Sequence, residues 1–80
     1  MGWNTVEGLR SPLFDGIEPE SYVYYVHSFA PDVCCHTIAT TRYGTAFSAA
    51  LQNSNFFGTQ FHPEKSGAVG ARIIENFLRL

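Results

Sequence analysis

The residues best placed to do chemistry are His62 and Glu64, which stand two apart in the stretch Phe61-His62-Pro63-Glu64-Lys65. The pair is expected at the end of a strand, where side chains at i and i+2 point to the same side. A carboxylate beside an imidazole can fix the ring's tautomer and stabilise the imidazolium. Pro63 biases His62 towards extended geometry. The spacing therefore fits the base and its orienting acid in a nucleophile–His–acid triad.

The same pair also has a plainer interpretation. A His-x-Glu pair is common, and taken alone it can be a surface pair or a satisfied polar contact. A metal site would need further ligands, and the spacing of His27 and His36 matches no zinc pattern. The sequence therefore predicts no metal and gives no indication of a cofactor.

Strands are expected to position this pair. Segments rich in β-branched, aromatic or alternating apolar residues predict strands at 22–29, 34–41, 46–51 and 56–61. Turn residues separate them, with Tyr43-Gly44 between the second and third. The stretch from 7 to 20 has loop composition, with the pair Leu13-Phe14 as an anchor to a core.

A helix is expected over 68–80, with Ser66 or Gly67 as its cap. Its apolar side chains recur at helical spacing, at Ala71, Ile74, Phe77 and Leu78. Strands followed by a helix predict an α/β layer. Because one helix covers only one face of a sheet, the segment is expected to be part of a larger sheet.

The composition of the chain limits its domain size, its class of partner and its cellular location. Eighty residues with a net charge of −2 allow one small domain with a limited core, and the absence of a Lys/Arg cluster argues against nucleic acid as a partner. Only 15% of residues are charged, so much of the surface is expected to be covered by another structure. No apolar run is long enough to cross a membrane. The adjacent pair Cys34-Cys35 cannot staple a loop, and no signal peptide is present, so we expect a cytoplasmic protein.

The stretch from Phe57 to Gly67 resembles the C-terminal signature of class I glutamine amidotransferases, G-x-Q-F-H-P-E. In that family the His and Glu complete a triad with a Cys from a G-x-C-x-G elbow nearer the N-terminus. The resemblance implies an α/β, flavodoxin-like domain, with residues 1–80 as the C-terminal part of a single glutamine amidotransferase type-1 domain. It makes His62 the general base and Glu64 its orienter.

Other segments resemble the family of glutaminase subunits of imidazole glycerol phosphate synthase, of histidine biosynthesis. They are Met1-Gly2-Trp3-Asn4, the run from Tyr22 to Ser28, the run from Thr40 to Gly44, and Asn76-Phe77-Leu78. The resemblance implies that glutamine is hydrolysed to glutamate and ammonia. It further implies that the ammonia passes to a cyclase subunit, a (β/α)₈ barrel, which uses it to make imidazole glycerol phosphate.

Individual positions follow from the same resemblance. Ser28 and Phe29 match the segment that holds the backbone groups of glutamine, although the family often has Tyr in place of Phe29. The positions that match the interface with the cyclase barrel are Met1, Trp3, Asn4, Tyr24 and Lys65. Judged from residue type alone, Met1 and Trp3 would instead be core residues and Lys65 a solvated charge.

The chain departs from the family at the nucleophile, because no G-x-C-x-G occurs in the 80 residues. Cys34 and Cys35 have no glycine beside them for a strained elbow, and we expect them to be small buried residues. Met1 is expected to be an internal methionine, which makes the chain a fragment that is inactive alone. The rival hypothesis is a non-catalytic interaction module that keeps only the barrel-facing surface.

Overall fold

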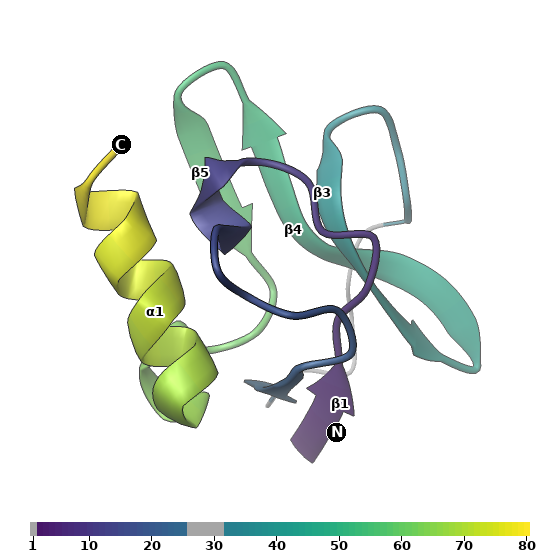
Figure 1. The fold of residues 1–80 in the computed structure, drawn as a ribbon. Helices are drawn as coiled ribbons and strands as arrows, with labels where there is room; N and C mark the ends of the chain where they lie inside the picture. The colour runs from purple at the N-terminus through teal and green to yellow at the C-terminus, as the bar shows by residue number, and fades with distance from the viewer. Residues whose placement is uncertain (1, 26–31) are drawn as a thin grey trace.

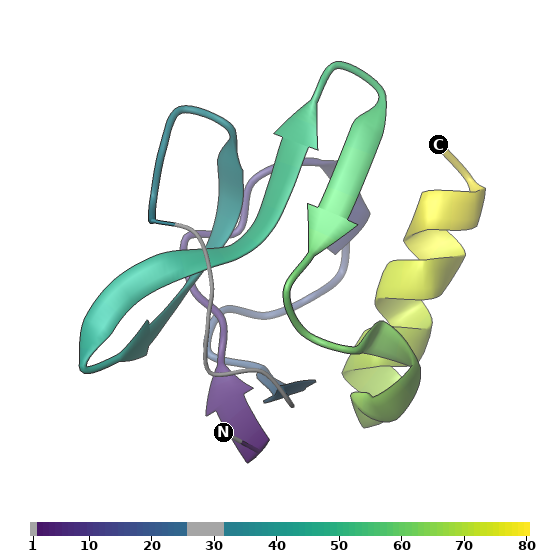
Figure 2. The same cartoon turned by 180° about the vertical axis from the view of Figure 1, so that it is seen from behind.

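The computed structural model describes residues 2–25 and 32–80. It contains five strands and one α-helix, with helix α1 lying beside β5 in both views of the ribbon (Figures 1 and 2). The strands are β1 (Gly2–Thr5), β2 (Tyr22–Tyr25), β3 (Thr37–Tyr43), β4 (Thr45–Asn53) and β5 (Phe56–Thr59). The helices are α1 (Gly67–Leu78) and two short 3₁₀ turns, η1 (Pro12–Phe14) and η2 (Pro63–Lys65). No helix in this part of the chain is long and apolar enough to span a membrane.

The strands form two antiparallel sheets, β1–β2 and β3–β4–β5, where the sequence predicted segments of one larger sheet. The residues that follow β1 join them. The Val6 N–H donates to the Ser21 carbonyl at 3.0 Å, and the next N–H, of Glu7, donates to the Thr40 carbonyl at 2.7 Å. Within two residues, the segment after β1 therefore changes its hydrogen-bond partner from the residue before β2 to strand β3. This change joins the two sheets around one core.

Most expected strands are confirmed, with shifted ends. The strand expected at 34–41 is β3 and begins only at Thr37, because Cys35 and His36 form a turn. The turn at Tyr43-Gly44 is confirmed, with Gly44 at φ +80°, where glycine is favoured. The strand β1 was not expected, since four mixed residues carry no alternating pattern. Of the strand expected at 22–29, only β2 falls within the described residues.

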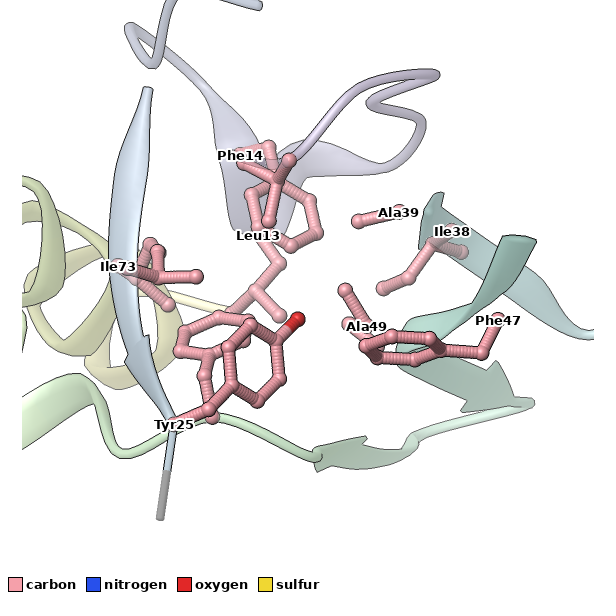
Figure 3. Close-up of a cluster of buried hydrophobic side chains, with 12 residues drawn as sticks. Leu13, Phe14, Tyr25, Ile38, Ala39, Phe47, Ala49 and Ile73 are labelled. Atoms are coloured by element: carbon pink, nitrogen blue, oxygen red, sulfur yellow. The ribbon is translucent and has the colours of Figure 1, made fainter. Parts of the chain in front are cut away.

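Among the described residues, the core is a single cluster of twelve buried hydrophobic side chains (Figure 3). Tyr25 lies within it, in edge-to-face contact with Phe47 and Phe61 at centroid separations of 5.6 and 6.1 Å. Leu13 and Phe14 are 2% and 4% exposed, so the expected anchoring of the long loop by this pair is confirmed. Edge-to-face ring pairs add to the burial energy of the rings themselves.

The hydroxyl of Tyr25 is buried and has a defined role as a donor. It lies 2.7 Å from Thr41 Oγ1, which in turn donates its only hydrogen to the Thr5 carbonyl at 2.9 Å. Tyr25 must therefore donate to Thr41. Burial raises the pKa of Tyr25 to about 12. This chain of hydroxyls ties β2 to β3 and β1 through the core.

Helix α1 buries a different face from the one expected. Its buried residues are Gly70, Ile73 and Asn76, whereas Ile74 and Phe77 are 39% and 51% exposed. The Asn76 amide explains why this face of the helix is buried, because its Nδ2 donates to the carbonyls of Leu13 at 2.9 Å and Asp15 at 2.8 Å. Ile74 and Phe77 border an open groove of about 200 Å³. Phe77 also meets the sheet, since its ring lies edge to face with that of Phe57 in β5 at a centroid separation of 6.0 Å. The expected packing of the stripe on the sheet is therefore confirmed only at Phe77.

We predict that the chain loses stability as pH rises from 10 to 12. The folded state holds the Tyr25 proton more tightly than the unfolded chain, so this contribution is complete below pH 10 and is lost towards pH 12. The loss should reach about 2–3 kcal/mol. Urea unfolding across this range measures it. Tyr25→Phe should flatten the pH dependence, whereas Tyr43→Phe, at a 64% exposed site, should leave it as steep as in the parent chain. A Tyr25→Phe variant with the parent's slope would contradict the assignment.

Candidate functional site

The predicted contact between His62 and Glu64 is present. His62 Nδ1 lies 3.1 Å from Glu64 Oε2, and the two side chains are 30% and 61% exposed. The backbone between them differs from the expectation, because β5 ends at Thr59 and residues 63–65 form the 3₁₀ turn η2. The pair therefore meets across a turn and not along one side of a strand.

Main-chain contacts fix the turn in place. The His62 N–H donates to the Tyr24 carbonyl at 2.9 Å, which attaches the turn to β2. Within the turn, the Lys65 N–H donates to the His62 carbonyl at 3.0 Å and the Ser66 N–H to the Pro63 carbonyl at 3.1 Å. Pro63 occupies the first position of the 3₁₀ turn, where the missing N–H costs nothing.

The carboxyl group of Glu64 is biased towards its ionised form. A hydrogen bond from its own backbone N–H lowers its pKa most, followed by the hydrogen bond with the His62 side chain. The charges of His62 and Lys65 act in the same direction. An ionised Glu64 on Nδ1 holds the ring in the tautomer that carries its hydrogen on Nδ1. Nε2 is then the ring atom that exchanges a proton with a nucleophile.

The expected interface residues gather partly around β1 and β2. Trp3 and Tyr24 form an edge-to-face pair with centroids 5.5 Å apart, and Trp3 is 54% exposed, which excludes a core role for it. Lys65 is exposed in η2, and the bond from His62 to Tyr24 places that turn beside β2. Asn4 has internal partners, since its Nδ2 donates to the Arg42 carbonyl at 3.3 Å and its Oδ1 accepts from the Thr5 N–H.

Three of the predicted site residues, Met1, Ser28 and Phe29, lie outside the described residues. Cys34 and Cys35 are both exposed, so the expectation that they are buried is wrong. Cys34 precedes the turn that leads into β3, and Cys35 forms part of that turn. Across the described ranges, no group of three or more His, Cys, Asp or Glu side chains is arranged to hold a metal ion.

Sequence reasoning missed two residues that shape the site. Ser66, expected as a helix cap, makes no side-chain bond to the helix and instead bonds to the main chain of β2 and the turn. Gly70 brings α1 against the turn, because a Cβ there would overlap the Pro63 carbonyl oxygen and would lie 2.9 Å from Ser66 Cβ. A glycine inside an otherwise regular helix was the one available signal, since such a residue often marks a close approach.

Comparison with known proteins identifies the family. A model of the class I glutamine amidotransferase family matches residues 1–80. The chain belongs to this family. Among curated proteins it is similar to imidazole glycerol phosphate synthase subunit HisH of Vibrio cholerae, with 58% identity over 81 residues. The proteins of the same name from Bacteroides thetaiotaomicron and Shewanella sediminis are 55% and 51% identical over 80 residues.

Each of these alignments covers the whole chain and 40%, 41% and 37% of the respective relative. The chain thus spans about two fifths of the length of the curated relatives that it matches. The antiparallel strands and single helix described above are part of an α/β class I amidotransferase domain. The assignment of residues 1–80 to the C-terminal part of that domain stays a prediction, based on the motif around His62.

We predict that Gly70→Ala destabilises the chain and displaces the turn that carries His62. The new methyl group would overlap a backbone oxygen that cannot rotate away, so α1 and the turn must separate. Overpacking of this kind costs about 1–3 kcal/mol or more. Urea unfolding gives the loss. Gly58→Ala is the matched control, since a Cβ there meets nothing within 4 Å. Equal stability of the two variants would refute the close approach.

Proposed function

We propose that these residues supply the acid–base part of a glutaminase, the glutaminase subunit of imidazole glycerol phosphate synthase. The observation that carries the proposal is the 3.1 Å contact between His62 Nδ1 and Glu64 Oε2, in a chain of the class I amidotransferase family. In this proposal the cysteine nucleophile and the oxyanion donors come from a part of the domain outside these 80 residues. Ser28 and Phe29 hold the glutamine.

The chemistry is acyl transfer through a thioester. Nε2 of His62 takes the cysteine proton as the sulfur attacks the amide carbon of glutamine. The same nitrogen gives that proton to the leaving nitrogen as the carbon–nitrogen bond breaks, and ammonia is released. His62 then takes a proton from water, which attacks the thioester. Glutamate leaves and the thiol is restored. Glu64 stabilises the imidazolium at each step and remains ionised, in keeping with its lowered pKa.

Exposed apolar side chains support a larger domain. Phe56 and Leu78 are each 77% exposed, and Ile74 and Phe77 border the open apolar groove beside α1. Large exposed apolar residues concentrated on one helix and one edge strand are characteristic of a surface that another element covers. We propose that the rest of the same domain covers this surface and brings its cysteine to His62.

The partner in this proposal is the cyclase subunit, a (β/α)₈ barrel that receives the ammonia in the cytoplasm. Exposed Trp3, its half-buried partner Tyr24 and exposed Lys65 are the residues best placed to meet it, because aromatic rings and a flexible cation beside the turn suit an interface rim. Met1 and Asn4 belong to the same proposed interface, with Asn4 acting through the backbone contacts that it makes within this chain.

The proposal is tested by supplying the part of the domain that carries the cysteine nucleophile. We expect the 80-residue chain alone to release no ammonia from glutamine. Co-expressed with a half that carries the G-x-C-x-G elbow, and with the cyclase barrel, it should give glutamine-dependent synthesis of imidazole glycerol phosphate. His62→Ala should lower glutaminase turnover by about 10²–10⁴-fold. Lys65→Ala should lower it far less when the cyclase is left out.

Two results would contradict this account. The first is ammonia release by the purified 80-residue chain that disappears on His62→Ala, since it would mean that a nucleophile lies within these residues. The second is equal loss of partner-free turnover in Lys65→Ala and His62→Ala. Tight binding to the cyclase with no turnover in any assembled form would instead favour a non-catalytic interaction module.

A further inference from the structure

The hydroxyl of Ser66 lies between two main-chain groups that belong to different elements. Ser66 is 2% exposed. Its Oγ accepts a hydrogen bond from the Tyr24 N–H at 2.9 Å and donates one to the His62 carbonyl at 2.6 Å. A single serine side chain thus connects strand β2 to the residue at the centre of the proposed site.

The hydrogen bonds of Ser66 form a closed ring together with a direct main-chain hydrogen bond between His62 and Tyr24. The His62 N–H donates to the Tyr24 carbonyl at 2.9 Å, while Ser66 Oγ links the Tyr24 N–H to the His62 carbonyl. The N–H and the carbonyl of both Tyr24 and His62 therefore all make hydrogen bonds within this ring. Without the hydroxyl, the part-buried Tyr24 N–H loses its partner, which is a costly state for a backbone donor.

The turn that carries the pair needs an attachment to the rest of the fold. The side chains of His62 and Glu64 are 30% and 61% exposed. The turn that carries them is only three residues long. A catalytic group must be held within about 0.5 Å of its productive position. The main-chain attachment to β2 holds the backbone from which the imidazole projects.

An ordinary capping role does not account for Ser66. It stands at the N-cap position of α1, but its side chain makes no bond to the first N–H groups of the helix. Its backbone φ and ψ of −103° and 24° differ from the extended values typical of capping residues. The hydroxyl points back to the turn and to β2, away from the helix that follows.

We propose that Ser66 is a positioning residue for the general base, its hydroxyl fixing the main chain of His62 against β2 so that the imidazole meets Glu64. This inference rests on the proposed function of His62. Ser66 touches neither substrate nor nucleophile in it and acts only through His62. A loss of the hydroxyl lets the turn shift away from β2, and the His62–Glu64 contact lengthens.

The test uses a full-length glutaminase subunit in which these 80 residues replace the matching stretch of the Vibrio cholerae relative. Ser66→Ala is compared with Ser48→Ala, the matched control. Ser48 is fully buried, and its Oγ lies 2.6 Å from Thr37 Oγ1 and donates to the Asp32 carbonyl at 2.9 Å. Both changes remove a buried hydroxyl that joins two partners, but only one of these hydroxyls contacts His62.

Two readouts are measured at equal folded fraction. Ser66→Ala should lower kcat by about 10–100-fold, the scale of a small misplacement of a catalytic group, with the KM for glutamine close to that of the parent. By NMR, the pKa of Glu64 should rise part of the way towards its ordinary value. The bond from its own backbone N–H, which lowers the pKa most, is local and should remain, whereas the bond with His62 that lowers it next should lengthen. His62 and Lys65 are the charged groups that act on this carboxylate. Ser48→Ala should change neither readout.

The outcomes separate this inference from the proposed function. If the parent graft turns over glutamine and Ser66→Ala matches Ser48→Ala in kcat and in the Glu64 titration, the positioning role is refuted while the function stands. If the parent graft is inactive but Ser66→Ala alone shifts the Glu64 titration, the proposed function fails and Ser66 still positions the pair. An unshifted Glu64 titration in an inactive graft overturns both.

Discussion

The geometry of the candidate site depends on the attachment of the short turn η2 to strand β2. His62 meets Tyr24 through a direct main-chain bond and through the Ser66 hydroxyl, and Gly70 lets α1 pack directly against the same turn. Strand β2 is itself anchored by Tyr25, whose ring lies in the core and whose hydroxyl reaches Thr41. The main chain that carries the partly exposed imidazole is thus held by the buried residues beneath it.

Much of this could be predicted from the sequence, and the exceptions have physical reasons. The contact between His62 and Glu64 was predicted from their spacing. His62 itself has the expected extended backbone, at φ −98° and ψ 100°, but Glu64 lies in the 3₁₀ turn η2, and this turn brings the two side chains together. Helix α1 carried a clear helical period, and β3 and β5 were predicted from their composition. The segment of β4 alternated as a strand does, but its alanines also suited a helix, and the turn residues on either side decided for a strand. The role of Ser66 carried none, since a serine before a helix has the same appearance whether it caps the helix or bonds elsewhere.

The buried face of α1 shows a second limit of pattern reasoning. Periodicity identifies a helix and its apolar stripe, but the side of the helix that packs depends on what else is present. Here Asn76 and Gly70 face the chain's own loop and turn, because an amide can satisfy two carbonyls and a glycine permits close approach. The apolar stripe that includes Ile74 and Phe77 remains partly exposed. In a segment about two fifths of its relatives' length, we attribute that stripe to contacts with the remainder of the domain.

The central claim is that His62, oriented by Glu64, activates a cysteine outside these residues. The most direct test is the rate at which a glutamine analogue with an electrophilic carbon alkylates that cysteine in the assembled glutaminase. The parent should be trapped rapidly, His62→Ala should be slower by about 10²–10⁴-fold, and Glu64→Gln should lie between them. Equal trapping rates in all three proteins would contradict the claim, because the cysteine would then be activated without this pair.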